Sequence, residues 1–333
     1  MNPGKFKGET MTNLQQNNKV LDKLKEGFFN KTKKENKNIK LPSKVLFEEN
    51  GENCILKLDK DCVIKNVQTN ESAFESWILV LSIYTNYKKF ILKWEKPDNT
   101  KHNHYQRFLF RVRNFEKYFN DIFKIENLSL LDDLLIKENG KYFLNSPSNE
   151  RESNSEDLKS IEYAELSENS LENTICADKK FSKQFNLSET KRQLPVGVFQ
   201  ESVKKGNEIF SGGKSAIDLW GIGSDNSMNI FELKNHKNTG IGIISELLLY
   251  TEIILEVQKE NFKTENTEIK KSKKINSYFL CSSLHALLKD GGLLLVINEL
   301  NSRFKKDDIT FNLVTLSVKL DYQIANDLIK KES

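Results

Sequence analysis

The chain has 333 residues, which is enough for about two domains that each bury a core. Its longest apolar runs, residues 77–84 and 291–297, are much shorter than the roughly 20 apolar residues that a membrane-spanning helix needs. We therefore expect no membrane span, and the first residues show no secretory leader. The four cysteines have neither the spacing of a zinc site nor that of a disulfide framework. This excludes a cysteine-ligated zinc protein and a disulfide-rich secreted protein, and it predicts a reduced, cytoplasmic setting.

The formal net charge is only +4, from 51 Lys and Arg against 47 Asp and Glu, but the charges are unevenly spread. Basic residues exceed acidic residues in 1–150, whereas acidic residues slightly exceed basic residues in 151–333. A basic half joined to a slightly acidic half suits a module that contacts a polyanion beside a module that holds cations. Lys and Asn are abundant along the whole chain, so this asymmetry alone carries modest weight.

Two segments are expected in the first part of the chain. Residues 1–40 are rich in Lys, Asn and Gln and predict a flexible or loosely docked basic arm, in which residues 20–29 fit a helix. Residues 41–148 predict an α+β domain whose role, in binding or in targeting, stays open. Its expected elements are strands in 44–50, 53–67 and 88–94, a segment 71–84 that fits either helix or strand, and a helix over 104–123.

The second part of the chain follows a polar linker at residues 145–160, which contains a proline and has no apolar periodicity. Beyond it, residues 157–333 predict an α/β domain with a mixed sheet flanked by helices. The expected order is helix 157–177, strand 195–200, a hairpin at 215–238, helix 241–258, strand 275–283, helix 290–303 and strand 309–318.

The hairpin, SAIDLWGIGSDNSMNIFELKNHKN, carries charged residues on strands that otherwise look half buried. Side chains two positions apart on a strand share a face, so Glu232 and Lys234 point to the same side. Asp218 joins them only if the turn has the right length. A two-residue loop would put Asp218 on the wrong face, whereas a three-residue loop would pair it with Glu232 or Lys234. We therefore predict an odd-length loop or a bulge, with Gly223 the obvious place for it.

Two carboxylates on adjacent strands repel each other, and a divalent cation would remove that repulsion. Oxygen ligands without His or Cys favour Mg²⁺ or Mn²⁺ over Zn²⁺. The ammonium of Lys234 can then orient a water and stabilise a pentavalent phosphorus transition state. The charges alone leave open the alternative that Glu232 and Lys234 form an exposed pair on a solvated strand edge.

Asp218, a turn and then Glu232-Leu233-Lys234 resemble the D…(D/E)xK signature of the PD-(D/E)xK nuclease superfamily. The α-β-β-β-α-β order of that fold also matches, and the resemblance covers about residues 157–320. It implies a restriction-endonuclease-like domain in which Asp218 and Glu232 bind the metal and Lys234 positions or activates the attacking water. The superfamily often adds a carboxylate from the first helix, for which Glu172 is our choice and Glu168 the competitor. Ile217 stands where the motif name has proline, a tolerated variation.

Many members of the superfamily carry a Gln before a Tyr in the helix that follows the hairpin, where this chain has Glu246 and, four residues later, Tyr250. We interpret Glu246 as a solvated helix residue, with a cleft-facing Glu246 and Tyr250 as the alternative.

For contacts with nucleic acid, the candidates are three arginines interleaved with aromatic residues and one histidine beyond the hairpin. They are Arg107, Arg111, Arg113 and His236. The alternative for the arginines is that they lie on an ordinary amphipathic helix whose aromatic stripe is in the core. The alternative for His236 is that it is a loop residue without such a role.

The expected function is therefore that of a Mg²⁺- or Mn²⁺-dependent nuclease that hydrolyses phosphodiester bonds in nucleic acid, with DNA as the first choice and genome defence or restriction as a role that fits the superfamily. The alternative is a catalytically inactive nuclease-fold protein that binds nucleic acid or assists assembly. A third interpretation is an unrelated α/β domain in which these side chains diverge. The oligomeric state is left open between a monomer and a homodimer.

Overall fold

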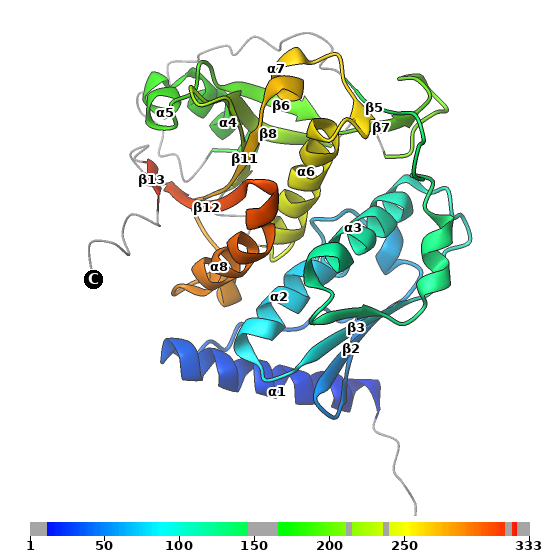
Figure 1. The fold of residues 1–333 in the computed structure, drawn as a ribbon. Helices are drawn as coiled ribbons and strands as arrows, with labels where there is room; N and C mark the ends of the chain where they lie inside the picture. The colour runs from blue at the N-terminus through cyan, green and yellow to red at the C-terminus, as the bar shows by residue number, and fades with distance from the viewer. Residues whose placement is uncertain (1–11, 146–165, 211–214, 236–239, 317–321, 325–333) are drawn as a thin grey trace, which may run out of the picture.

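The computed structural model describes residues 12–145, 166–210, 215–235, 240–316 and 322–324. Most of the predicted linker at 145–160 and the start of the predicted helix at 157–177 lie outside these residues, as does His236. Figure 1 shows the N-terminal half in blue, cyan and blue-green and the C-terminal half in green to red. Helices of the two halves are in contact.

The N-terminal half is built on a four-stranded sheet in the order β1-β2-β3-β4. The antiparallel β1–β2 pair is joined by a tight turn in which Gly51 has a φ of 60°, and β3 and β4 add in parallel. Its elements are α1 (Asn13–Thr32), β1 (Val45–Asn50), β2 (Asn53–Leu58), α2 (Phe74–Tyr84), β3 (Lys89–Trp94), α3 (Asn103–Phe119), β4 (Phe123–Ile125) and β5 (Tyr142–Leu144).

The helix α1 replaces the expected loose arm over residues 13–32. Thr12 and Gln15 form a capping box at its start, and Val20, Leu24 and Phe28 repeat every four residues and are buried on one face. That face packs on β1, so the helix is docked. The sequence indicated this helix only over residues 20–29 and only as loosely docked, because the polar composition of residues 1–40 hides a narrow apolar stripe.

The ambiguous segment 71–84 is the helix α2. Its residues from Phe74 to Leu81 are all buried, so its sequence shows neither the alternation of a half-buried strand nor the stripe of a surface helix. A helix that is apolar all round is one that is enclosed by other elements.

The C-terminal half is built on a six-stranded mixed sheet in the order β13-β12-β11-β9-β8-β6. Strands β9, β11 and β12 are parallel, and β8 is antiparallel to both of its neighbours. The elements are α4 (Glu168–Ala177), α5 (Lys179–Gln184), β6 (Lys191–Pro195), β7 (Val198–Gln200), β8 (Ala216–Ile222), β9 (Ser227–Lys234), α6 (Ile243–Gln258), β10 (Phe262–Lys263), α7 (Thr267–Lys271), β11 (Lys274–Cys281), α8 (Gly292–Phe304), β12 (Ile309–Leu316) and β13 (Tyr322–Ile324). The expected mixed α/β architecture is thus observed.

Each face of this sheet has its own apolar cover. Phe231 and Leu233 of β9 pack in a cluster with side chains of α4 and α5, whereas Ile230 belongs to the cluster that contains α6 and α8. The sheet is therefore the middle of three layers, and residues at even positions of β9 point towards α6.

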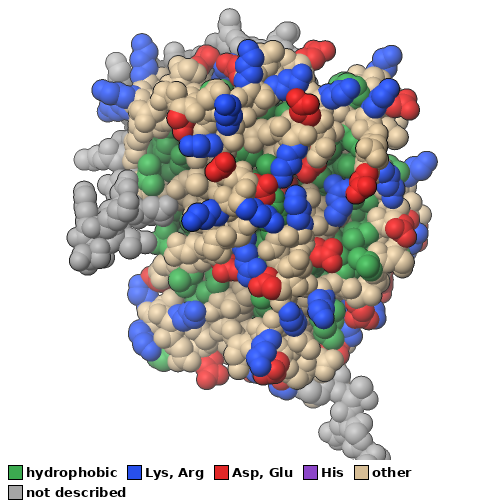
Figure 2. Space-filling view, viewed as in Figure 1, with side chains coloured by type: hydrophobic (Ala, Val, Ile, Leu, Met, Phe, Trp, Pro, Cys, Tyr) green, Lys and Arg blue, Asp and Glu red, His purple; other side chains and the backbone are tan. Residues whose placement is uncertain are grey.

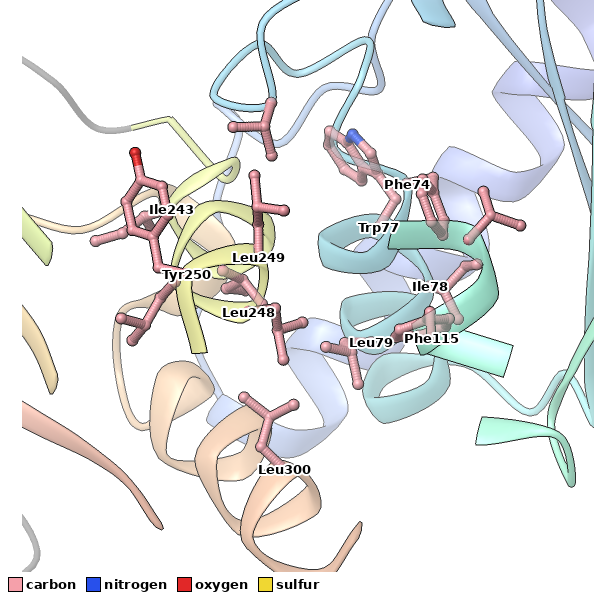
Figure 3. Close-up of a cluster of buried hydrophobic side chains, with 14 of the residues drawn as sticks. Phe74, Trp77, Ile78, Leu79, Phe115, Ile243, Leu248, Leu249, Tyr250 and Leu300 are labelled. Atoms are coloured by element: carbon pink, nitrogen blue, oxygen red, sulfur yellow. The ribbon is translucent and has the colours of Figure 1, made fainter. Parts of the chain in front are cut away.

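The two halves share one hydrophobic core rather than having a core each. The same buried cluster contains Phe74 and Trp77 of α2 together with Leu248 of α6 and Leu300 of α8, and Figure 3 shows these helices facing one another. A small sheet in the order β10-β5-β7 also pairs the end of the N-terminal half with the C-terminal half. The halves are therefore joined by packing and by backbone hydrogen bonds.

Candidate functional site

The turn between β8 and β9 has the predicted odd length. Gly223 N donates to Ser227 O at 2.9 Å, and Asn226 closes the turn in the left-handed region with a φ of 66°, which leaves residues 224–226 as a three-residue loop. The ladder then pairs Leu219 with Phe231. In this register Asp218 stands opposite Glu232, as the prediction required.

Asp218 lies at a gap in the sheet. Its carboxylate Oδ2 accepts a 2.8 Å hydrogen bond from the backbone N of Leu233, in place of a backbone carbonyl. On the other side, the β6–β8 pairing steps from Arg192 to Leu194 and leaves Gln193 opposite Asp218, with a left-handed φ of 53°. A non-glycine residue in that region is uncommon and is held there by its surroundings. The local distortion of β6 thus interrupts the β6–β8 ladder opposite Asp218.

Lys234 lies between two buried carboxylates. Its Nζ is 2.5 Å from Glu232 Oε1 and 3.1 Å from Glu246 Oε2, and all three side chains are at most 5 % exposed. The interpretation of Glu246 as a solvated helix residue is therefore wrong. Glu246 lies in the first turn of α6, where the helix dipole favours a negative charge, and Tyr250 one turn later donates to its Oε1 at 2.9 Å.

This cluster holds more carboxyl groups than cations. Burial raises the pKa of Asp218 to about 8, although Lys234 acts in the opposite direction. Burial, Asp218 and Glu246 likewise raise the pKa of Glu232 well above its usual range. For Glu246 the effect of burial is outweighed by Lys234 and by hydrogen bonds, so its pKa is lowered. One ammonium therefore serves three carboxyl groups, two of which favour the protonated form.

A hard divalent cation fits this imbalance. Glu232 Oε2 is buried and accepts no hydrogen bond from an N–H donor among the residues that the structure describes. The carboxyl group of Glu246 bonds to Glu232 only when a proton, or in its place a cation, lies between the two. No three His, Cys, Asp or Glu side chains among the described residues form a group arranged to hold a metal. Mg²⁺, however, commonly takes only one or two carboxylates and keeps several waters. Asp218 and Glu232, which face each other across the hairpin, are the pair that would hold it.

Glu172 is the better of the two candidates for the first-helix carboxylate. It is buried on the side of α4 that faces the sheet, and its Oε2 accepts from Gln193 Nε2 at 2.6 Å and from Arg192 at 3.2 Å. Burial raises the pKa of Glu172, and its charge in turn contributes to the raised pKa of Asp218. Glu168, at the first position of the helix, is only half-buried.

Of the three arginines proposed to contact nucleic acid, Arg107 and Arg111 are buried and Arg113 is half-buried. Arg111 is buried in an ion pair with Glu75 of α2, and its guanidinium also donates to Ser72 O at 2.8 Å. Arg107 is buried and donates to Ser215 Oγ at 2.7 Å, and Arg113 donates to Ile136 O at 3.0 Å. The buried ion pair with Glu75 contradicts the predicted phosphate contact for Arg111. Arg107 is also buried, whereas for the half-buried Arg113 the contact stays a prediction. Nothing is described of His236.

The exposed charges do not gather into a region of one sign on the face shown in Figure 2, where Lys and Arg alternate with Asp and Glu. Several of the lysines form surface ion pairs, such as Lys93 with Glu126 and Lys259 with Asp307. In the N-terminal half, ion pairs such as Lys93 with Glu126 compensate part of the expected basic character.

Two residues at the site were missed from the sequence. Gln193 reaches Glu172, and Gln68, from the N-terminal half, donates its Nε2 to Glu246 Oε1 at 2.5 Å. Gln68 is 178 positions away from Glu246. No periodicity or spacing in the sequence links residues so far apart, and only the shared core brings them together.

Comparison of the chain with protein-family models, with curated proteins and with solved structures gave no match. Within the described part of the chain, none of the helices has the length and apolar character needed to cross a membrane.

Proposed function

We propose that the protein is a divalent-metal-dependent nuclease that hydrolyses phosphodiester bonds, with DNA as its substrate. The observation that carries this proposal is the convergence of Glu232, Lys234 and Glu246 in one buried cluster, beside a carboxyl group of Asp218 that the register sets opposite Glu232. Buried carboxyl groups with raised pKa values next to an ammonium are typical of sites that bind cations or transfer protons.

The order of elements supports the same proposal. Apart from four short elements, α5, β7, β10 and α7, the C-terminal half runs α4, β6, β8, β9, α6, β11. This agrees with the α-β-β-β-α-β order of the PD-(D/E)xK superfamily that the hairpin resembles. The signature residues then occupy the second and third strands of the central sheet, at the end where α6 begins.

In this proposal each residue has a distinct task. Asp218 and Glu232 hold Mg²⁺ or Mn²⁺, which when bound would polarise the scissile phosphate and lower the pKa of a bound water. Lys234 orients the attacking water and stabilises the negative charge that develops on the phosphate. Glu172, held by Gln193 and Arg192, adds negative charge on the far side of Asp218 and so favours a cation there.

The test is incubation of purified protein with supercoiled plasmid DNA in Mg²⁺ or in EDTA. The wild-type protein is expected to nick or linearise the plasmid only with the metal, and the Glu232→Gln variant is expected to be inactive under both conditions. Cleavage that persists in EDTA, or that Glu232→Gln retains, would exclude the proposed function.

One observation favours a second function, that of a catalytically inactive module that binds nucleic acid or assists assembly. The ammonium of Lys234 is already neutralised by Glu232 and Glu246, so the cluster can serve to join β9 to α6 without any metal. An inactive module that binds nucleic acid would slow the migration of plasmid DNA in a gel-shift assay. It would leave the plasmid uncut in Mg²⁺ and in Mn²⁺.

A further inference from the structure

Two parts of the N-terminal half reach the first turn of α6, which carries Glu246. Ser76 of α2 and Ser245 share a hydrogen bond of 2.8 Å between their hydroxyl groups, and Ser245 also donates to Glu75 Oε2 at 2.8 Å. Gln68, in the loop before α2, donates its amide to the Glu246 carboxylate itself at 2.5 Å. The carboxylate at the candidate site is thus bonded by a side chain of the other half.

The backbone of the Gln68 loop also lies directly on the start of α6. A Cβ placed on Gly242, which precedes the helix, would lie only 2.3 Å from the carbonyl oxygen of Gln68. Gly242 has a φ of −60°, so the small residue is required here by the close approach and not by its own backbone conformation. The loop and the helix start are therefore fixed relative to each other.

We propose that Gln68 is a positioning residue of the candidate site, and that it holds the Glu246 carboxylate in the orientation in which Glu246 and Glu232 together fix Lys234. The inference rests on the proposed nuclease function. Glu246 Oε1 accepts from Gln68 and Tyr250, which turns Oε2 towards Lys234 at 3.1 Å. Without Gln68, Glu246 Oε1 keeps Tyr250 as its donor but loses the second one, so the carboxylate is held less firmly and the ammonium shifts towards Glu232. The N-terminal half is then a part of the active site, beyond any role in binding DNA.

The kinetic test uses Gln68→Met, which keeps the length of the side chain and removes the donor. Because Gln68 is exposed apart from its amide contact, the variant is expected to fold. Loss of the hydrogen bond to the charged Glu246 is expected to lower kcat roughly 10- to 100-fold in Gln68→Met and to leave KM for DNA nearly unchanged. The matched control is Gln200→Met, at the exposed end of β7, which should cleave at the wild-type rate.

A double-mutant cycle identifies the residue through which Gln68 acts. In a Glu246→Gln background, Gln68→Met is expected to lower kcat no further. Gly242→Ala, which must push the Gln68 loop away, is expected to lower kcat as Gln68→Met does and to add little to it. A raised KM, equal losses in both backgrounds, or an unchanged kcat in Gln68→Met would overturn the proposal.

The same double-mutant cycle can be measured by thermal unfolding in EDTA, which does not depend on cleavage activity. Gln68→Met is expected to lower the melting temperature by a few degrees in the wild-type background and by clearly less in the Glu246→Gln background. If the wild-type protein fails to cleave DNA while this coupling is present, the nuclease function is wrong and the contact between the halves stands. Equal losses in the two backgrounds would overturn the inference irrespective of cleavage.

Discussion

Lys234 of β9 and Glu246 of α6 form a buried ion pair, with 3.1 Å between Nζ and Oε2. Burying an ammonium is costly unless charged partners and hydrogen bonds compensate for the lost water. Here the two carboxylates raise the pKa of Lys234 well above its usual range, although burial alone would lower it. The lysine is therefore a permanent cation at the candidate site, suited to stabilising negative charge and unsuited to acting as a neutral base.

This relationship predicts that Lys234→Ala loses most of its cleavage activity while it still binds DNA. Removing one preorganised stabiliser of transition-state charge typically costs about 3 to 4 kcal/mol, or about 10² to 10³ in kcat. The kcat of the variant should be compared with that of wild type in single-turnover assays, and DNA affinity measured by fluorescence anisotropy. Lys234→Met, which keeps the apolar stem, should be as inactive; activity near the wild-type level in either variant would remove Lys234 from the mechanism.

The response to Mg²⁺ provides a prediction that needs no substrate. Mg²⁺ is expected to raise the melting temperature of the wild-type protein, and Asp218→Asn and Glu232→Gln are each expected to abolish this rise. Because the pKa of Asp218 is raised to about 8, the metal must displace a proton at neutral pH. The Mg²⁺-induced shift should therefore increase from pH 6 to pH 9.

The control for the Mg²⁺ experiment is Asp98→Asn, which removes an exposed carboxylate that pairs with Lys60. It should leave the shift intact. A shift that is the same in all four proteins, or that decreases as the pH rises, would show that the ion does not bind at Asp218 and Glu232.

The part of the site that lies within the hairpin could be predicted because its geometry is local. Once the strands on either side of the turn are recognised, the number of loop residues alone decides whether Asp218 stands opposite Glu232. The order of the later helices and strands was likewise readable from apolar runs. The contact of Gln68 with the site and the inward orientation of Glu246 could not be predicted, because both depend on α2 packing against α6. A sequence pattern does not show which distant helices meet.

The arginines of α3 show a different limit. Their alternation with aromatic residues predicts a surface that could contact phosphates, yet Arg111 is buried because Glu75, 36 positions earlier, neutralises it. Arginines in an aromatic-rich helix indicate either an exposed basic face or a buried ion pair. Only the partner distinguishes the two, and that partner comes from another helix.

Arg111→Met is accordingly expected to destabilise the fold rather than weaken DNA binding. Removing one member of a buried pair leaves Glu75 uncompensated and typically costs about 3 to 5 kcal/mol. Urea unfolding should show this loss, and the Arg111→Met, Glu75→Leu double variant should recover much of it. The dependence of DNA affinity on salt should keep its wild-type slope. If DNA affinity depends less steeply on salt in folded Arg111→Met than in the wild-type protein, Arg111 does contact phosphates and the buried-pair interpretation is wrong.

The docking of α1 depends on Glu49 of β1, which accepts hydrogen bonds and ion pairs from Lys19 and Lys23 of the helix and a 2.9 Å hydrogen bond from Tyr87. Burial acts to raise the pKa of Glu49, but these three partners outweigh it and lower the pKa from 4.5 to about 2. A carboxyl group whose pKa is lowered by folding stabilises the folded state above its unfolded pKa. That contribution is lost as the pH falls from 4.5 towards 2.

Glu49→Gln should therefore lower the free energy of unfolding by about 1 to 2 kcal/mol at pH 7, in the range of charged hydrogen bonds that are partly exposed. The difference from wild type should shrink steadily below pH 4.5, because the wild-type carboxylate becomes protonated there. Denaturant unfolding at pH 7, 5, 4 and 3 measures this trend, with Glu52→Gln, whose exposed side chain pairs with exposed Lys88, as the matched control. A Glu49→Gln effect that does not change with pH would mean that the charge of Glu49 does not contribute to the docking of α1.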